Sequence, residues 1–242
     1  MDLHGLLQAA PQLHSDFSGA VTSWQLSNEV LQFIDGAIDE QSITLETGEG
    51  VSTILFAIKK SRHTCVSPNQ GAIDNIVQFC AQHGIATDRL SFEVKPSEEA
   101  LPFLANNPLD LVLIDGGHGF PTPFVDWRYT ATRLQKGGLL VLDDTQLWTV
   151  RTLRDFLASE PEWRLEQDFA RSSVFRKVAE YRPREWIQQP YVAELSRSLR
   201  VAADKSERRR QTAARVRRGL AMAQRGEFVT LARLLLRRSA SR

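Results

Sequence analysis

Three aspartates and one histidine stand directly after two strongly apolar runs of the sequence. Asp115 ends the run "LDLVLID", the pair Asp143 and Asp144 ends "GGLLVLDD", and His118 follows Asp115 by three residues. Carboxylate oxygens bind hard divalent cations such as Mg²⁺, and an imidazole can accept a proton near neutral pH. The pattern therefore predicts a metal site formed by Asp115, Asp143 and Asp144, with His118 beside it. Aspartates that only cap turns at strand ends are the alternative.

An alternating series of strands and helices has to position these side chains. Apolar runs of strand length are separated by segments with helical spacing, and such alternation predicts an open, mostly parallel α/β sheet with helices on both faces. Right-handed crossovers bring the carboxyl ends of parallel strands to one edge, where ligands bind. The expected strands are 42–46, 63–67, 90–94, 109–115, 137–144, 163–169 and 172–178, and the expected helices are 51–60, 70–84, 97–107, 123–135 and 149–159.

Composition divides the chain into an acidic body and a basic end. Residues 1–180 contain 14 Lys and Arg against 24 Asp and Glu, a net charge of −10, whereas residues 181–242 contain 16 against 5, a net charge of +11. We therefore expect a helical lead-in or cap over 1–41, a Rossmann-like domain over 42–180 and a basic helical extension over 181–242. The extension is expected to form two amphipathic helices joined at Gly226.

These helices favour pairing in a homo-oligomer or contact with an anionic surface. Nucleic acid is disfavoured as a partner, since the basic residues are not interleaved with aromatic ones. No apolar run of the sequence approaches the roughly 20 residues that span a bilayer, and the N-terminus lacks the pattern of a secretory signal. We therefore expect a cytoplasmic protein.

The loop "LETGEGVST" follows the first expected strand and precedes a helix. Gly48 and Gly50 allow a tight turn and a close approach of a ligand to the backbone, with the free N–H groups of the helix behind them. A dinucleotide-binding fingerprint would have a third Gly or Ala where Thr53 stands. Glu46, at the end of the strand, is also unusual for a dehydrogenase, and it suits a nucleoside that carries an ammonium group.

Taken in order, "LETGEGVST", "DLVLIDGGH", "FVDW" and "GGLLVLDD" resemble the class I S-adenosylmethionine-dependent methyltransferases over about residues 24–178. They are most similar to the bacterial metal-dependent O-methyltransferases. The resemblance implies a seven-stranded Rossmann-like sheet whose last strand is antiparallel. It also implies that His118 removes the proton of a hydroxyl that is methylated with the help of Mg²⁺. The implied cofactor-binding residues are Glu46, Gly48, Gly50, Ser52, Ser97, Glu98 and Asp115.

One position departs from the family pattern. The second strand usually ends in an acid that holds the ribose hydroxyls of the cofactor, but here Ser67 stands at that place. A serine hydroxyl can hydrogen-bond a ribose, without the strength of a charged acceptor, and Asn69 can share the task.

The sequence thus predicts an S-adenosylmethionine-dependent O-methyltransferase for a small hydroxylated molecule, with a sugar or glycan end favoured by analogy. Two alternatives stay open. Ser67 and the basic end are compatible with a non-catalytic interaction protein on the same fold. A nicotinamide-dependent oxidoreductase is disfavoured by Thr53 and by the missing acid at Ser67.

Overall fold

The computed structural model describes residues 1–15, 21–22 and 25–227. The chain divides into two compact units, Met1–Arg184 and Glu185–Arg242. The first unit holds the sheet and its helices, and the second holds the short 3₁₀ helix η2 and the long helix α8. None of the helices in the described ranges is both long enough and apolar enough to cross a lipid bilayer.

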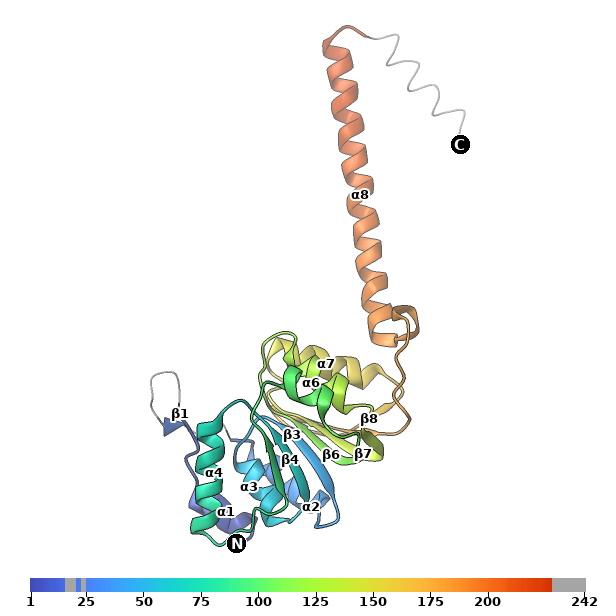
Figure 1. Ribbon diagram of the computed structural model, residues 1–242. Helices are drawn as coiled ribbons and strands as arrows, with labels where there is room; N and C mark the ends of the chain where they lie inside the picture. Colours follow the sequence, from blue (N-terminus) through green and yellow to red (C-terminus); the bar gives the residue numbers. More distant parts are fainter. Residues whose placement is uncertain (16–20, 23–24, 228–242) are drawn as a thin grey trace. The chain divides into compact units, whose positions relative to one another are not determined.

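A seven-stranded sheet forms the centre of the first unit (Figure 1). Its strand order is β5-β4-β3-β6-β7-β9-β8, in which neighbours from β5 to β7 are parallel and β9 runs antiparallel to both β7 and β8. This confirms the predicted mostly parallel sheet with an antiparallel last strand. The strands are β3 Ile43–Thr47, β4 Arg62–Val66, β5 Leu90–Glu93, β6 Leu109–Ile114, β7 Leu134–Leu142, β8 Trp163–Asp168 and β9 Ser173–Lys177.

Helices cover both faces of the sheet, because each face is apolar and has to be removed from water. One buried cluster joins α1, α2, α3 and α4 to the sheet, and a second joins α6 and α7 to it (Figure 1). A separate two-stranded antiparallel ribbon, β1 with β2, follows α1. The bounds are α1 Leu3–Ala9, β1 His14–Ser15, β2 Val21–Thr22, α2 Asn28–Ala37, α3 Val51–Ile58, α4 Gln70–Gln82, α5 Ser97–Ala100, η1 Leu101–Phe103, α6 Thr122–Thr130 and α7 Trp148–Ser159.

The strand register aligns the carboxyl ends of four neighbouring strands. Thr47 of β3 is paired with Val66 of β4 and with Ile114 of β6, and Ile114 is paired with Leu142 of β7. The next residue of each strand therefore lies at one edge of the sheet, as predicted. These four residues are Gly48, Ser67, Asp115 and Asp143.

Two predicted helices are shorter than their spacing indicated. The segment 97–107 is a single turn, α5, followed by the 3₁₀ helix η1, in which Pro102 cannot continue the hydrogen-bonding pattern. The helix expected over 123–135 ends at Thr130, because β7 already begins at Leu134. The fully buried Lys177 stabilises this junction: its Nζ donates to the carbonyl oxygen of Ala131 at 3.1 Å and to that of Leu134 at 2.5 Å.

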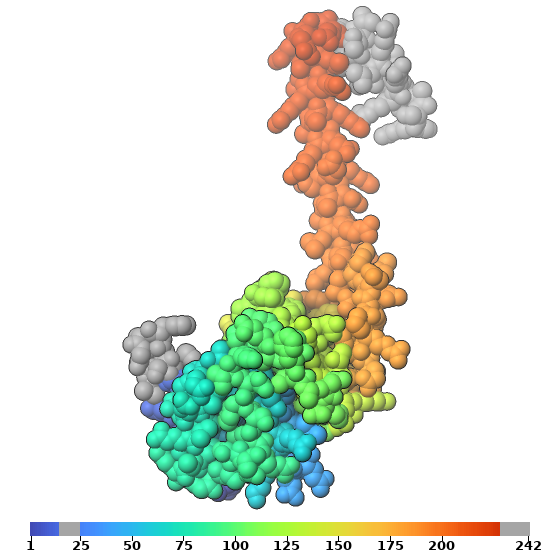
Figure 2. All heavy atoms as spheres, viewed as in Figure 1, coloured from blue at the N-terminus to red at the C-terminus, as the bar shows by residue number. Residues whose placement is uncertain are grey.

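The second unit begins with η2, Trp186–Gln188, and continues as one helix of 35 residues, α8, Pro190–Gln224. Its side chains project along the whole length of the helix, drawn in orange in Figure 2. The helix ends two residues before Gly226, whose φ of +74° is the left-handed conformation that closes helices. The second expected helix would begin beyond Glu227, outside the described residues.

Candidate functional site

Gly48 lies where the loop after β3 crosses the end of β6. Its φ is +88°, and a Cβ atom at this position would lie 2.3 Å from the carbonyl oxygen of Asp115. Its N–H donates to the carbonyl oxygen of Val66 at 3.0 Å. Only glycine therefore allows this turn, and the turn packs the predicted cofactor loop directly against the strand that carries Asp115.

Glu46 is buried and its carboxylate is held by the protein itself. It accepts hydrogen bonds from the Ser52 hydroxyl at 2.7 Å and from the Thr53 hydroxyl, and it lies 3.1 Å from Nε2 of His63. Thr53 Oγ1 in turn accepts the N–H of Gly50 at 3.0 Å. These contacts fasten the first turn of α3 to the end of β3. Thr53 thus has a structural use at the place where a dinucleotide fingerprint has its third glycine.

Asp115, His118 and Asp144 form a compact cluster beside this loop. One potential ligand atom of each residue lies within 4.8 Å of the other two, and Nε2 of His118 is 3.0 Å from Oδ2 of Asp144. Burial, together with the nearby charges of Asp143 and Asp144, raises the pKa of Asp115 well above its usual value. Carboxylates crowded in this way favour a bound cation.

The adjacent aspartates after β7 point to different partners. Asp143 is buried, accepts a hydrogen bond from the Ser172 hydroxyl, and has a pKa that burial raises. Asp144 has a left-handed backbone with φ of +54°, and its carboxylate lies near His118, Arg171 (3.0 Å) and Gln146 (2.6 Å). The geometry therefore brings Asp144 into the cluster with Asp115. The role of Asp143 as a metal ligand stays a prediction that this geometry does not favour.

The residues expected on the nucleoside side lie at the ends of β4 and β5. Ser67 is buried, and its hydroxyl accepts the N–H of Asn69 at 3.1 Å. The side chain of Asn69 accepts the N–H of Ala72 at 3.2 Å and so caps α4. Ser97 and Glu98 form the first turn of α5, with Ser97 buried. All four therefore stand along the edge that carries Gly48 and Asp115.

Three further polar groups at this edge were not anticipated. Glu49, between the two glycines, carries a nearly buried carboxylate 3.6 Å from Nδ1 of His14, which comes from β1. Asp126 of α6 is fully buried and accepts the Thr47 hydroxyl at 2.7 Å. Glu49 could have been noticed in the sequence as an acid between the two glycines of the turn. No sequence pattern connects His14 to a loop 35 residues later.

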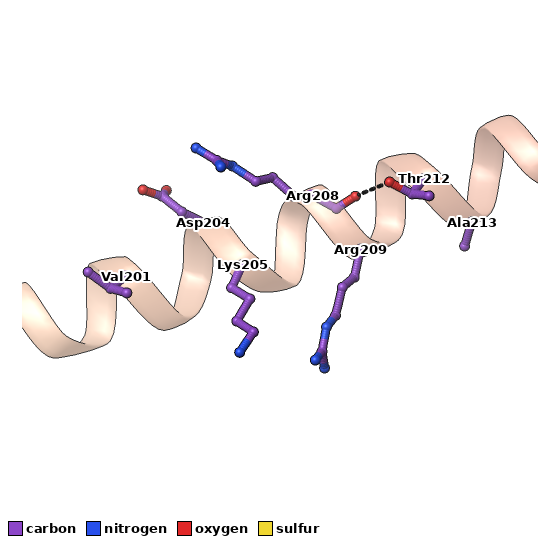
Figure 3. A pocket seen from close by; sticks show the side chains of 7 residues that line it. All are labelled: Val201, Asp204, Lys205, Arg208, Arg209, Thr212 and Ala213. Atoms are coloured by element: carbon purple, nitrogen blue, oxygen red, sulfur yellow. Dashed lines mark hydrogen bonds between the residues drawn. The ribbon is translucent and has the colours of Figure 1, made fainter.

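A concave strip on α8 has a different character (Figure 3). Lys205 and Arg209 point to one side of the helix, one turn apart, and Asp204 and Arg208 to another. The strip belongs to a single exposed helix, and its lining contains a single carboxylate. It is thus a basic surface, without the converging acids and imidazole of the sheet edge. Its lining residues are Val201, Asp204, Lys205, Arg208, Arg209, Thr212 and Ala213.

One known protein family matches the part of the chain that carries the residues at this sheet edge. The family described as "Methyltransferase domain" matches residues 45–145, which run from β3 through the loop, the strand before Asp115 and the Asp143–Asp144 pair. This part of the chain is similar to that family. A search of curated proteins gives no match to the chain.

Several solved structures share the fold of this chain at low sequence identity. Cofactor-bound Rv0187 from MTB is 20% identical, with a TM-score of 0.57 over 74% of this chain and 90% of that one. The O-methyltransferase TomG from Streptomyces achromogenes, in complex with SAM, is 16% identical, with a TM-score of 0.57 over 72% and 90%. An rRNA methylase from Streptococcus thermophilus is 15% identical, with a TM-score of 0.51 over 65% and 100%. The chain therefore shares its fold with these solved structures.

Proposed function

We propose that this chain is an S-adenosylmethionine-dependent O-methyltransferase that methylates a hydroxyl group of a small molecule. The observation that carries the proposal is the cluster of Asp115, His118 and Asp144 directly beside the Gly48 turn. The turn suits a nucleoside cofactor, and the cluster suits an acceptor whose proton has to be removed. TomG, one of the similar structures, is an O-methyltransferase solved with SAM, which supports the same assignment.

The donor set of the cluster suits a divalent cation. Asp115 and Asp144 would hold it through carboxylate oxygens, and the crowding that raises the pKa of Asp115 favours a positive charge at this point. Bound there, Mg²⁺ would make a coordinated hydroxyl more acidic and would orient a second, neighbouring hydroxyl. We favour a vicinal diol, such as a sugar or glycan end, as the acceptor because two adjacent oxygens match this chemistry.

His118 is the proposed base. An ionised carboxylate only accepts hydrogen bonds, so the 3.0 Å contact with Asp144 places the proton of the neutral imidazole on Nε2 and leaves the lone pair on Nδ1. Asp144 thereby orients the ring, and Thr149 fixes the segment by donating to the carbonyl oxygen of His118. In the reaction the acceptor oxygen bonds to the methyl carbon, the carbon–sulfur bond breaks, and His118 takes the hydroxyl proton.

A direct test measures transfer of a labelled methyl group from S-adenosylmethionine to catechol and sugar-diol acceptors, with Mg²⁺ or Mn²⁺. We expect His118→Asn to reduce the rate at least ~100-fold, since general-base catalysis contributes about 10²–10⁴. His4→Asn is the matched control, because His4 is exposed on α1 and contacts Gln8. A wild-type rate in His118→Asn would contradict the role of His118.

A second candidate function is a non-catalytic member of the fold. Two observations favour it. Both carboxylate oxygens of Glu46 already accept hydrogen bonds from side chains of the protein. Arg171 forms an ion pair with Asp144 and would compete with a cation for that carboxylate. This candidate predicts that the chain binds no Mn²⁺ at the cluster. Measuring Mn²⁺ binding by electron paramagnetic resonance in the wild type and in Asp144→Asn separates the two candidates, because only the enzyme should lose a bound ion in the variant.

A further inference from the structure

The end of β4 lacks the acid that Rossmann-type sheets use to hold a ribose. In such sheets an Asp or Glu about 20 residues after the glycine-rich turn binds the ribose hydroxyls from the end of the second strand. In this chain β4 ends at Val66, and the next residue is Ser67, which is buried and neutral. A nucleoside at this edge would therefore have no carboxylate from β4.

A carboxylate from another strand is present at the same place. Glu49 belongs to the turn after β3, and the polar side chains of Ser67 and Asn69 lie close enough to its carboxylate to oppose a rise of its pKa. It is only 9% exposed, and burial is the largest influence on its pKa, which is raised. Glu49 thus brings a carboxylate from the turn after β3 to the polar side chains that follow β4.

Among the described residues, another acid already serves as the structural anchor of this loop. Glu46 already fastens the loop to α3 through Ser52 and Thr53. His14, which lies 3.6 Å from Glu49, is a poor counter-ion, because burial lowers its pKa and favours the neutral imidazole. A nearly buried carboxylate beside a neutral ring is costly, and polar neighbours such as Ser67 and Asn69 offset only part of that cost.

We propose that Glu49 binds the ribose diol of the adenosyl cofactor and so replaces the acid that β4 lacks. Ser67 and Asn69 orient its carboxylate, and the two carboxylate oxygens accept the 2′ and 3′ hydroxyls. The assignment rests on the proposed function, which supplies the nucleoside.

The order of the strands agrees with this placement. Along the sheet edge the strands lie in the spatial order β5, β4, β3 and β6. Ser97 and Glu98 follow β5, Glu49 spans β4 and β3, and Asp115 follows β6. A nucleoside laid along this edge has its base toward β5, its ribose at Glu49 and its reactive end toward Asp115, beside the cluster that would bind the acceptor.

The test compares two ligands that differ in one hydroxyl: S-adenosylhomocysteine and its 2′-deoxyribose analogue. Calorimetric titration of the full chain should give an affinity ~10- to 100-fold higher for the ribose form, the range for a hydrogen bond to a charged group. In Glu49→Gln the affinity for the ribose form should fall ~10- to 100-fold, so that the variant binds both ligands about equally. Glu40→Gln, an exposed acid in the turn before β3, is the matched control and should bind as the wild type does.

A rescue variant distinguishes a loss of affinity that comes from the missing carboxylate from one that comes from misfolding. Adding Ser67→Asp to Glu49→Gln returns a carboxylate to the end of β4 and should restore the preference for the ribose form. If Glu49→Gln keeps both the affinity and the preference of the wild type, the assignment of Glu49 is overturned while the proposed function stands. If the wild-type chain binds neither ligand at millimolar concentration, the proposed function itself fails and the assignment falls with it.

Discussion

Replacing Asp126 by Asn should stabilise the protein more at neutral pH than at acidic pH. Asp126 lies on α6 with no exposed surface, and burial raises its pKa to about 6 from the ordinary 3.8, against the opposing hydrogen bond from Thr47. An asparagine has nearly the same shape, and its amide oxygen can still accept the Thr47 hydroxyl, but it has no charge to bury.

The sign follows from the two pKa values. As pH rises through 3.8 the unfolded chain ionises Asp126, whereas the folded chain keeps the proton until about pH 6. Stability is therefore lost between these values, and above pH 6 the cost reaches its full size. A difference of about 2 pKa units corresponds to about 3 kcal/mol, because each unit is worth 1.36 kcal/mol.

Urea unfolding of the wild type and of Asp126→Asn at pH 7.5 and pH 4.5 measures this cost. Because the wild type already bears part of the cost at pH 4.5, the gain from the substitution should be larger at pH 7.5 by about 2 kcal/mol. The comparison within each pH removes the contributions of other titrating groups. An effect of the substitution that is the same at both pH values would refute the reasoning.

Three further predictions concern packing and organisation. Gly48→Ala should destabilise the fold by about 2 kcal/mol or more in thermal unfolding, since its Cβ would lie 2.3 Å from the carbonyl oxygen of Asp115 in a left-handed backbone; unchanged stability would contradict the close crossing. Lys177→Met should cost about 3 kcal/mol in urea unfolding because two buried carbonyl oxygens lose their donor, and a cost below about 1 kcal/mol would show that water replaces it. A chain that ends at Arg184 should remain folded by circular dichroism, because residues 1–184 form a compact unit; an unfolded spectrum would show that the unit depends on α8.

The sheet was predictable because its strands are buried on both faces. Runs such as "LVLI" before Asp115 contain no polar residue, so both the strand and its end are evident in the sequence. Register follows from the parallel topology, and it brings Gly48, Ser67 and Asp115 to one edge. The alignment of these strand ends was therefore predictable, whereas their role in binding a ligand stays a prediction.

The details that failed depend on local backbone conformation and on contacts between distant segments. Which of two adjacent aspartates faces His118 is decided by the left-handed backbone of Asp144, which no periodicity encodes. The helix expected over 97–107 ends early because Pro102 stands within its second turn. The position of Glu49 beside Ser67 requires knowing how two separate loops meet, and a single sequence does not carry that information.

The central claim is that the edge formed by Gly48, Glu49 and Asp115 binds the adenosyl cofactor of a methyl-transfer reaction. Calorimetric titration of the full chain with S-adenosylhomocysteine tests it most directly. We expect saturable binding of one molecule per chain, weakened at least ~10-fold by Glu49→Gln through the loss of charged hydrogen bonds. No measurable binding by the wild-type chain at millimolar ligand would contradict it.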